Sequence, residues 1–393
     1  MDRRIYLDHA ATTPVREEAW EAMRPFLAET FGNPSAFYEE GQKAKAALMK
    51  ARSAIAATLG VKENEIYFTS GGSEADNWAL VGTFEASDGR GKHIITTAIE
   101  HHAVLETCRY LEKRGAEITY IGVDENGLVD PAEIERAIRP DTILISVMYA
   151  NNEIGTIQPI REIGKIASEH GIVFHTDAVQ AYTHLPIRPA EEGIDLLSVS
   201  GHKFGGPKGT GFLYIRNGIA LEPCMRGGRQ ERGRRAGTEN VSGIIGLAAA
   251  AKASIHEMEG EGCRELALRD DFLERILSEV PCCRVNGDRK KRLPGNINLC
   301  FDYIQGESAL VILDRRGISA SSGSACTSGA LDPSHVLLAI GLSREEASGS
   351  IRLTIGRETT EEELKEAAGV LIDTVEHLRQ YSDAYRAYME EHE

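Results

Sequence analysis

The alternation of strand-like and helix-like segments between about residues 60 and 215 constrains the fold more than any other feature of the chain. The β-branched runs IYFTS, HIITTAI and TILISVMY are each followed by a longer segment with helical periodicity, namely SEADNWALVGTF, HAVLETCRYLEKRG and IREIGKIASEHG. Repeated β-then-α units fold into a mainly parallel sheet covered by helices. The runs IVFHTDA, DLLSVSGHK and GTGFLYIR continue the series, and the glycines of the last run indicate a hairpin-like return. We therefore expect one large α/β domain.

The pattern changes after Asn240. A long helical segment runs from VSGIIGLAAAAKASIHEMEGE through ELALRDDFLERILSEV, and is followed by the strand-like runs NINLCF and SIRLTI and a final helix, TEEELKEAAGVLIDTVEHLRQY. A chain of 393 residues with 42% hydrophobic content can bury two cores. We expect a smaller α+β domain of residues 1–13 and 259–393 beside a large domain of residues 14–258.

Charge and hydropathy exclude several classes of partner. The 60 acidic side chains outnumber the 44 basic ones, and a net charge of −16 repels polyanions, so we expect no nucleic acid partner. No stretch approaches the roughly 18 uncharged apolar residues of a membrane helix. The start of the chain, MDRRIYLDHAATTP, lacks the apolar core of a signal peptide. These features predict a cytoplasmic protein that does not enter a membrane.

The seven cysteines form no CxxC pair and no regular framework, which predicts reduced thiols and no metal site built by this chain alone. They are Cys108, Cys224, Cys263, Cys282, Cys283, Cys300 and Cys326. One local exception to the acidic composition is residues 226–235, RGGRQERGRR, with five arginines. This segment is either a solvated loop or an anion-binding segment.

Lys203, in the run Ser200-Gly201-His202-Lys203, closes an apolar stretch and so lies at the carboxyl end of a predicted strand. In open α/β sheets ligands bind beyond the carboxyl ends of the strands. An amine there can condense with an aldehyde cofactor, for which pyridoxal phosphate is the obvious candidate. A solvated surface lysine is the alternative.

Other polar groups follow neighbouring strands. Gly71, Gly72 and Ser73 lie between a strand and a helix, where glycine backbone and helix-start amides favour a phosphate, although Ser73 could equally be an ordinary helix cap. Asp177 ends the run IVFHTDA, and its carboxylate could pair with a protonated pyridine nitrogen. His101 opens a helix after another strand, with His102 as a competing choice for ring stacking or proton transfer. Ser73, His101, Asn152, Asp177 and Lys203 all follow predicted strands of one sheet, so we expect them to converge.

The run Ser321 to Gly329, SSGSACTSG, contains nothing that can build a core. Such a composition favours an accessible loop, here about residues 321–332, and makes Cys326 a candidate nucleophile. Arg352 lies within the strand-like run SIRLTI, where a charge must face solvent or a partner. A bidentate grip on a substrate carboxylate would account for it.

Nine segments together make the chain resemble the cysteine desulfurases of the NifS/IscS family over essentially its whole length. They are YLDHAATTP, FGNPS, SGGSEADN, EHHAVLE, NNEIGT, HTDAVQA, SGHKFGGPKG, RRAGTEN and SSGSACTSG. The resemblance implies fold type I of the pyridoxal-phosphate-dependent transferases (class V aminotransferase-like), in which a mainly parallel seven-stranded-type sheet forms the large domain. It also implies a homodimer whose active sites draw on both subunits.

The resemblance assigns roles by matching motif. Lys203 would hold pyridoxal 5'-phosphate covalently, His101 would stack on its ring and transfer protons, and Asp177 would bind the pyridine nitrogen. Gln180 would contact the ring oxygen. The phosphate would be held by Gly72, Ser73, Ser200 and His202, with Thr238 from the partner subunit. The substrate amino acid would be oriented by Asn33, Asn152 and Arg352, and Asn152 would also contact the cofactor.

The implied reaction converts L-cysteine to L-alanine. Cys326 would attack the substrate sulfur, keep it as a persulfide, and pass it to an iron-sulfur scaffold protein of the IscU/NifU type or to a sulfur carrier. Cys326 could also ligate a cluster held by such a scaffold. Two departures stand out: the chain reads Ala347-Ser348-Gly349 where relatives often have Ala-His-Gly, and Ser73 where they often have threonine.

Selenocysteine lyase and other lyases or aminotransferases with the same cofactor are the alternatives, because one cofactor site supports several outcomes. A plain aminotransferase needs no thiol such as that of Cys326. From a different class, the chain could be a non-catalytic scaffold for sulfur trafficking.

Overall fold

The computed structural model describes residues 4–87, 89–322 and 333–392. A seven-stranded sheet forms its centre, in the order β2-β8-β7-β6-β5-β3-β4. All neighbouring strands are parallel except β8, which is antiparallel to β2 and β7. The predicted parallel sheet and the return at GTGFLYIR are thereby confirmed. The strands are β2 (Ile66–Thr69), β3 (His93–Thr97), β4 (Glu117–Ile121), β5 (Thr142–Ser146), β6 (Val173–Asp177), β7 (Leu196–Ser200) and β8 (Gly211–Ile215).

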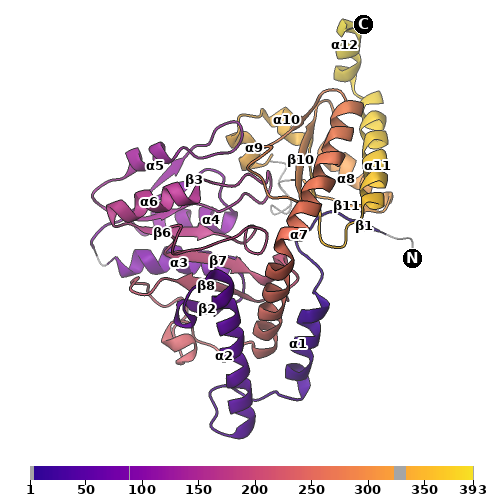
Figure 1. Ribbon diagram of the computed structural model, residues 1–393. Coiled ribbons are helices and arrows are strands. Elements are labelled where there is room, and N and C mark those ends of the chain that lie inside the picture. Colours follow the sequence, from indigo (N-terminus) through magenta and orange to yellow (C-terminus); the bar gives the residue numbers. More distant parts are fainter. Residues whose placement is uncertain (1–3, 88, 323–332, 393) are drawn as a thin grey trace.

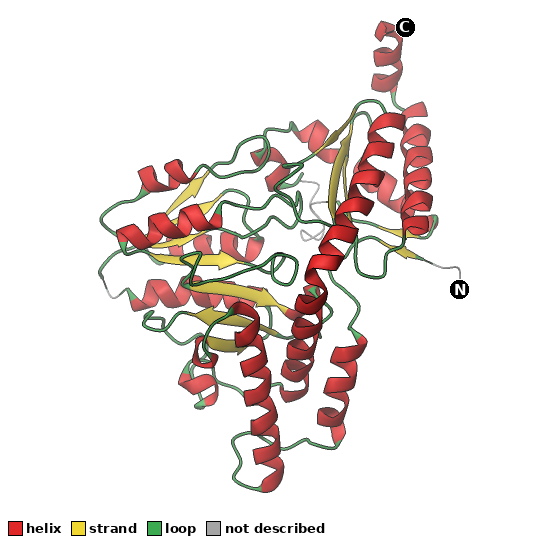
Figure 2. Cartoon of the chain, viewed as in Figure 1, coloured by secondary structure: helices red, strands yellow, loops and turns green. Residues whose placement is uncertain are grey.

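Helices cover both faces of this sheet, as Figures 1 and 2 show. Alternate strand residues point to opposite faces, so Ile94 belongs to one apolar cluster and Ile95 to another. The first cluster includes residues of α3 (Gly72–Ala86) and α4 (His102–Glu112). The second includes residues of α2 (Glu39–Leu59), α6 (Ile160–His170) and α7 (Val241–Glu279), while α5 (Pro131–Ala137) adds Ile134. Burial on both faces explains why the strands read as continuous apolar runs.

The second half of the chain builds a separate antiparallel sheet of three strands, ordered β12-β10-β9. These are β9 (Cys283–Val285), β10 (Asn296–Phe301) and β12 (Ser350–Thr354). A third apolar cluster joins Leu299 and Leu353 of this sheet to the end of α7 and to α8 (Gly306–Arg315) and α11 (Glu361–Gln380). A short parallel pair, β1 (Ile5–Tyr6) and β11 (Ile318–Ser319), lies beside them.

Helix α7 is 39 residues long and passes from the large sheet to the small one (Figure 1). The predicted boundary near residue 258 falls within this continuous helix. The two-domain division of residues 14–258 against 1–13 and 259–393 stays a prediction.

The remaining elements lie at the periphery. Helix α1 (Glu17–Ala28) packs with α2 along α7, and α12 (Asp383–His392) projects at the far end of the molecule (Figure 1). Within the described residues no helix is both long and apolar enough to cross a membrane. The other short helices are η1 (Glu63–Glu65), η2 (Gly201–Lys203), η3 (Gln230–Gly233), α9 (His335–Ala339) and α10 (Arg344–Ser348).

Candidate active site

The carboxyl ends of β2, β3, β5, β6 and β7 share one edge of the large sheet, because these strands run in the same direction. The structure therefore brings the predicted strand-end groups to one edge. Asp177 is the last residue of β6, Ser200 is the last of β7, and Lys203 ends the helical turn η2 that follows. His101 caps α4 after β3, and α3 begins at Gly72 after β2.

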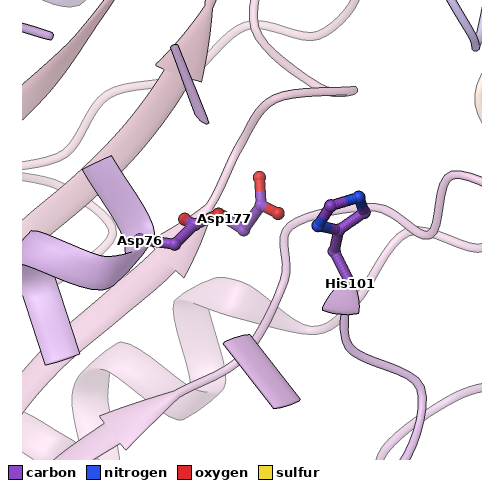
Figure 3. Close-up of side chains that lie close together, drawn as sticks. All are labelled: Asp76, His101 and Asp177. Atoms are coloured by element: carbon purple, nitrogen blue, oxygen red, sulfur yellow. The ribbon is translucent and has the colours of Figure 1, made fainter. Parts of the chain in front are cut away.

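Asp177 and His101 form the centre of this edge together with Asp76 of α3 (Figure 3). One nitrogen or oxygen atom of each side chain lies within 4.8 Å of the others. Burial raises the pKa of Asp177, while His101 and Lys203 act in the opposite direction. Burial lowers the pKa of His101, whose Nδ1 accepts a hydrogen bond from the Ala103 backbone N–H at 3.0 Å. Burial therefore opposes a charge on either group, while the carboxyl and the imidazole each favour the charged form of the other.

The start of α3 has the features of an anion site. Its N-cap is Gly71, where an added Cβ would lie 3.4 Å from Ser200 Oγ. At Gly72 an added Cβ would lie only 2.6 Å from the Val179 side chain, so the backbone there is closely packed. Ser73 is exposed in the first turn, so the alternative in which Ser73 is the helix cap is wrong. Unpaired amides of a first helical turn and the exposed hydroxyl can donate to a phosphate.

The predicted lysine contacts the N-terminal segment. Lys203 Nζ donates to the carbonyl oxygens of Ala10 and Ala11 at 2.5 and 2.9 Å. Gln180 Nε2 also donates to the Ala10 oxygen, at 3.0 Å. His202 Nδ1 lies 3.1 Å from Thr12 Oγ1, and burial lowers the pKa of His202 to about 4. The segment YLDHAATTP therefore contributes backbone to this site.

Arg352 of β12 is buried rather than directed to solvent, which settles the choice left open by the sequence. Its Nη2 lies 2.9 Å from Asp8 Oδ1, and its Nη1 donates to the backbone oxygen of Asn152 at 3.1 Å. Its Nε has no hydrogen-bond partner among the described residues. The guanidinium thus reaches the Asn152 segment at the edge of the large sheet.

Cys326 lies outside the described residues. The described chain on both sides of it is attached near the site. Ser321 exchanges two backbone hydrogen bonds with Arg352, at 2.6 and 3.1 Å. On the other side, Ser334 Oγ donates to Glu153 at 2.5 Å, and His335 Nε2 lies 3.0 Å from the backbone oxygen of Glu100.

Two further predicted residues are exposed. Asn33, between α1 and α2, accepts a hydrogen bond from the Ser35 backbone N–H at 2.9 Å, and Thr238 precedes α7. Among the residues that the structure describes, neither side chain is hydrogen-bonded to the groups around Asp177.

The arginine-rich segment 226–235 is anchored to the body of the protein and is not a freely solvated loop. Glu231 is buried and pairs with Arg52 at 2.6 Å, and Arg235 pairs with Glu74 of α3 at 2.8 Å. Arg232 stacks over the ring of Tyr67. Arg235 adds positive charge beside the start of α3.

Sequence reasoning missed three acids of this region: the buried Asp76 and Glu100, and the partly buried Asp8. Glu100 accepts from Thr97 Oγ1 and the Met148 backbone N–H, and burial raises its pKa to about 8. The sequence does contain a signal for the burial of Asp76, because this residue shares the apolar face of its helix with Ala75 and Ala79. Charged residues on a buried helix face are rare unless they are paired or neutral.

The donor set fits pyridoxal phosphate. A buried carboxylate at Asp177 suits a protonated ring nitrogen, the amides at the start of α3 suit a phosphate, and Lys203 supplies the amine that an aldehyde requires. Pyridoxal phosphate chemistry needs all three groups at one site, and this edge of the sheet provides them.

Comparison with known proteins agrees with this geometry. The aminotransferase class-V family model matches residues 5–366. A cysteine desulfurase IscS of Methanosarcina thermophila is 54% identical over 97% of this chain and 94% of its own length. The one from Dictyoglomus turgidum is 53% identical over 97% of each chain.

Solved structures are similar as well. A NifS-like protein matches with a TM-score of 0.90 at 36% identity, covering 95% of this chain and 100% of its own. A structure described as SspA in complex with cysteine matches with a TM-score of 0.80 at 39% identity, covering 89% and 98%. The expected family and cofactor are confirmed. The chain belongs to the pyridoxal-phosphate-dependent class-V aminotransferase family, among the cysteine desulfurases of the NifS/IscS type.

Proposed function

We propose that this protein removes sulfur from L-cysteine, releases L-alanine and retains the sulfur as a persulfide on Cys326. The observation that carries the proposal is the attachment of Ser321 to Arg352 by two backbone hydrogen bonds. The chain that leads to Cys326 thereby starts at the backbone of Arg352, the residue assigned to the substrate. Relatives more than 50% identical are cysteine desulfurases, which supports the same activity here.

The roles of the residues follow from their surroundings. Pyridoxal phosphate, when bound, supplies an electron-withdrawing ring that acidifies the substrate Cα–H bond. Asp177 would hold the ring nitrogen, and Lys203 would accept the Cα proton. His101 would cover the ring and move a proton, because its imidazole lies beside Asp177 and burial lowers its pKa.

The substrate would be held by its carboxylate. Arg352 already binds one carboxylate, that of Asp8, and its Nε, which has no partner in the described part of the chain, is a further donor. Asn152 and Asn33 would also contact the substrate amino acid and orient it. The phosphate would lie at Gly72, Ser73, Ser200 and His202, with Thr238 arriving from a second subunit.

The sulfur step balances without an added reagent. The Cys326 thiolate forms a bond to the substrate sulfur, the carbon–sulfur bond breaks, and its electron pair remains with the carbon skeleton. Protonation of that skeleton yields alanine. Cysteine and a thiol thus become alanine and a persulfide.

We infer a homodimer and a protein sulfur acceptor in the cytoplasm. Large exposed apolar side chains gather on α1, α2 and the segment between them, including Trp20, Phe31 and Phe37. Such a cluster is typical of a protein interface. The acceptor would be an iron-sulfur scaffold protein or a sulfur carrier.

The test is an assay of alanine and sulfide from L-cysteine plus a reductant, with Cys326→Ser in parallel. Matched alanine and sulfide, both lost in Cys326→Ser, would establish the reaction. A keto acid in place of alanine would show that the protein is an aminotransferase. Turnover of selenocysteine but not of cysteine would show a selenocysteine lyase. The absence of any product from the cofactor-loaded protein would indicate a scaffold.

A further inference from the structure

A second buried carboxyl group lies beside Asp177 and has no part in the reaction described above. Asp76 of α3 is 1% exposed. One of its oxygens is within 4.8 Å of both a carboxylate oxygen of Asp177 and a ring nitrogen of His101. In the view of Figure 3, Asp177 lies between Asp76 and His101. Asp76 is therefore a buried neighbour of the group assigned to the cofactor nitrogen.

Among the residues that the structure describes, none places a permanent positive charge on the Asp76 carboxyl. Asp76 Oδ1 lies 3.6 Å from His175 Nε2 and has no hydrogen-bond partner among the described residues. Burial lowers the pKa of His175 to about 3, so its ring is neutral. That ring is held between Ser198 Oγ at 3.0 Å and Ser146 Oγ at 2.8 Å. Ser198 also hydrogen-bonds the Asp76 carboxyl.

Two buried carboxyl groups this close do not both ionise, because repulsion and desolvation oppose the second charge. Three groups favour the anion on Asp177: His101, Lys203 and the Val179 backbone N–H, which donates to Asp177 Oδ1 at 2.9 Å. Burial raises the pKa of Asp76 well above its ordinary value, and Asp177 and Glu100 raise it further. These contacts favour the anion on Asp177 and the proton on Asp76.

We propose that Asp76 is a positioning residue that stays a neutral acid and so leaves a single negative charge on Asp177, where the cofactor nitrogen binds. Asp76 does not touch the cofactor but acts through Asp177. A second anion at this depth would add a charge that no described cation offsets. The proposal rests on the cofactor site and is independent of the desulfuration step.

The test uses three variants of the full-length protein. Asp76→Asn is neutral and almost isosteric, Asp76→Leu is neutral but cannot hydrogen-bond Ser198, and Glu85→Gln is a matched control on the same helix that pairs with surface arginines. We expect Asp76→Asn to bind pyridoxal phosphate within about threefold of the parent. Asp76→Leu should bind it roughly tenfold more weakly, since a buried hydroxyl loses its partner.

Two spectroscopic readouts separate this role from a structural one. With isotope-labelled pyridoxal phosphate and no substrate, the NMR shift of the ring nitrogen should show protonation in the parent, in Asp76→Asn and in Glu85→Gln. Without cofactor, the infrared difference between the parent and Asp76→Asn at pH 7 should contain the C=O band of a protonated acid.

Loss of ring-nitrogen protonation in Asp76→Asn, or no acid band in the parent, would overturn the proposal. If the parent protein shows the acid band but binds no pyridoxal phosphate, the proposed function is refuted. The positioning role of Asp76 is then refuted as well, because there is no cofactor nitrogen to bind. Normal cofactor spectra without alanine production would refute desulfuration alone.

Discussion

Arg352 and Asp8, which are 344 positions apart in the chain, form an ion pair of 2.9 Å in which both side chains are largely buried. Burial raises the pKa of Asp8, and Arg352 opposes that rise. The pair joins the three-stranded sheet to the N-terminal segment, and this segment also contacts Lys203 through Ala10 and Ala11. The guanidinium is thus held in place before any substrate carboxylate arrives.

The first prediction concerns Arg352→Lys. Lysine keeps the charge but cannot bind Asp8, the Asn152 carbonyl and a substrate carboxylate with one planar group. Loss of a charge-assisted hydrogen bond costs about 1.5–3 kcal/mol, so KM for L-cysteine should rise roughly tenfold to hundredfold. Steady-state kinetics checks this, and unchanged cofactor absorbance serves as the control. An unaltered KM would exclude Arg352 from substrate binding.

The second prediction concerns Gly72→Ala at the start of α3. The new Cβ would lie 2.6 Å from Val179, so strand end and helix start must separate. Overpacking of this kind costs about 1–3 kcal/mol, and the phosphate amides should shift with it. Cofactor affinity should fall roughly tenfold in a titration of the cofactor-free protein. Gly260→Ala is the control, since nothing lies within 4 Å of its new Cβ.

The third prediction concerns the buried pair of Arg52 and Glu231, joined at 2.6 and 2.8 Å. Glu231→Gln leaves a buried guanidinium without its counter-charge, which costs about 3–5 kcal/mol. The denaturant midpoint should drop strongly. For comparison, Glu117→Gln weakens exposed ion pairs with Lys92 and Arg139 and should alter stability far less. Equal effects of the two changes would contradict this account.

The fourth prediction concerns acid stability and His9. Burial lowers the pKa of His9 from 6.5 to about 4, so the unfolded chain binds a proton more readily than the folded one between these values. The contribution of His9 is full above pH 6.5 and falls by about 1.4 kcal/mol per pH unit as the pH decreases towards 4. His9→Asn should lose less stability than the parent between pH 7 and pH 5 in denaturant titrations of the cofactor-free protein. A parallel loss in both proteins would argue against a neutral His9.

Much of the fold follows from local patterns. The β-then-α alternation predicts the parallel sheet, and the strand ends predict that His101, Asp177 and Lys203 share one edge. This works because carboxyl ends of parallel strands meet at the same edge whatever the strand order. The motifs of the NifS/IscS type then connect that edge to a cofactor and to a family. The roles of the individual site residues stay predictions. Thr238 is expected to act from a second subunit, and Cys326 lies outside the described chain.

The tertiary structure alone decided which distant groups meet. Helical periodicity places Asp76 on a buried face, but only the packing of α3 on β6 and β7 puts its carboxyl beside Asp177 and Ser198. Asp8 and Arg352 likewise lie near opposite ends of the chain and meet because the N-terminal segment pairs with the second sheet. Local sequence determines strands, helices and their polar ends through short-range sterics and patterning. Non-local contacts depend on how those elements pack, and packing decides which buried acid is charged and which is neutral.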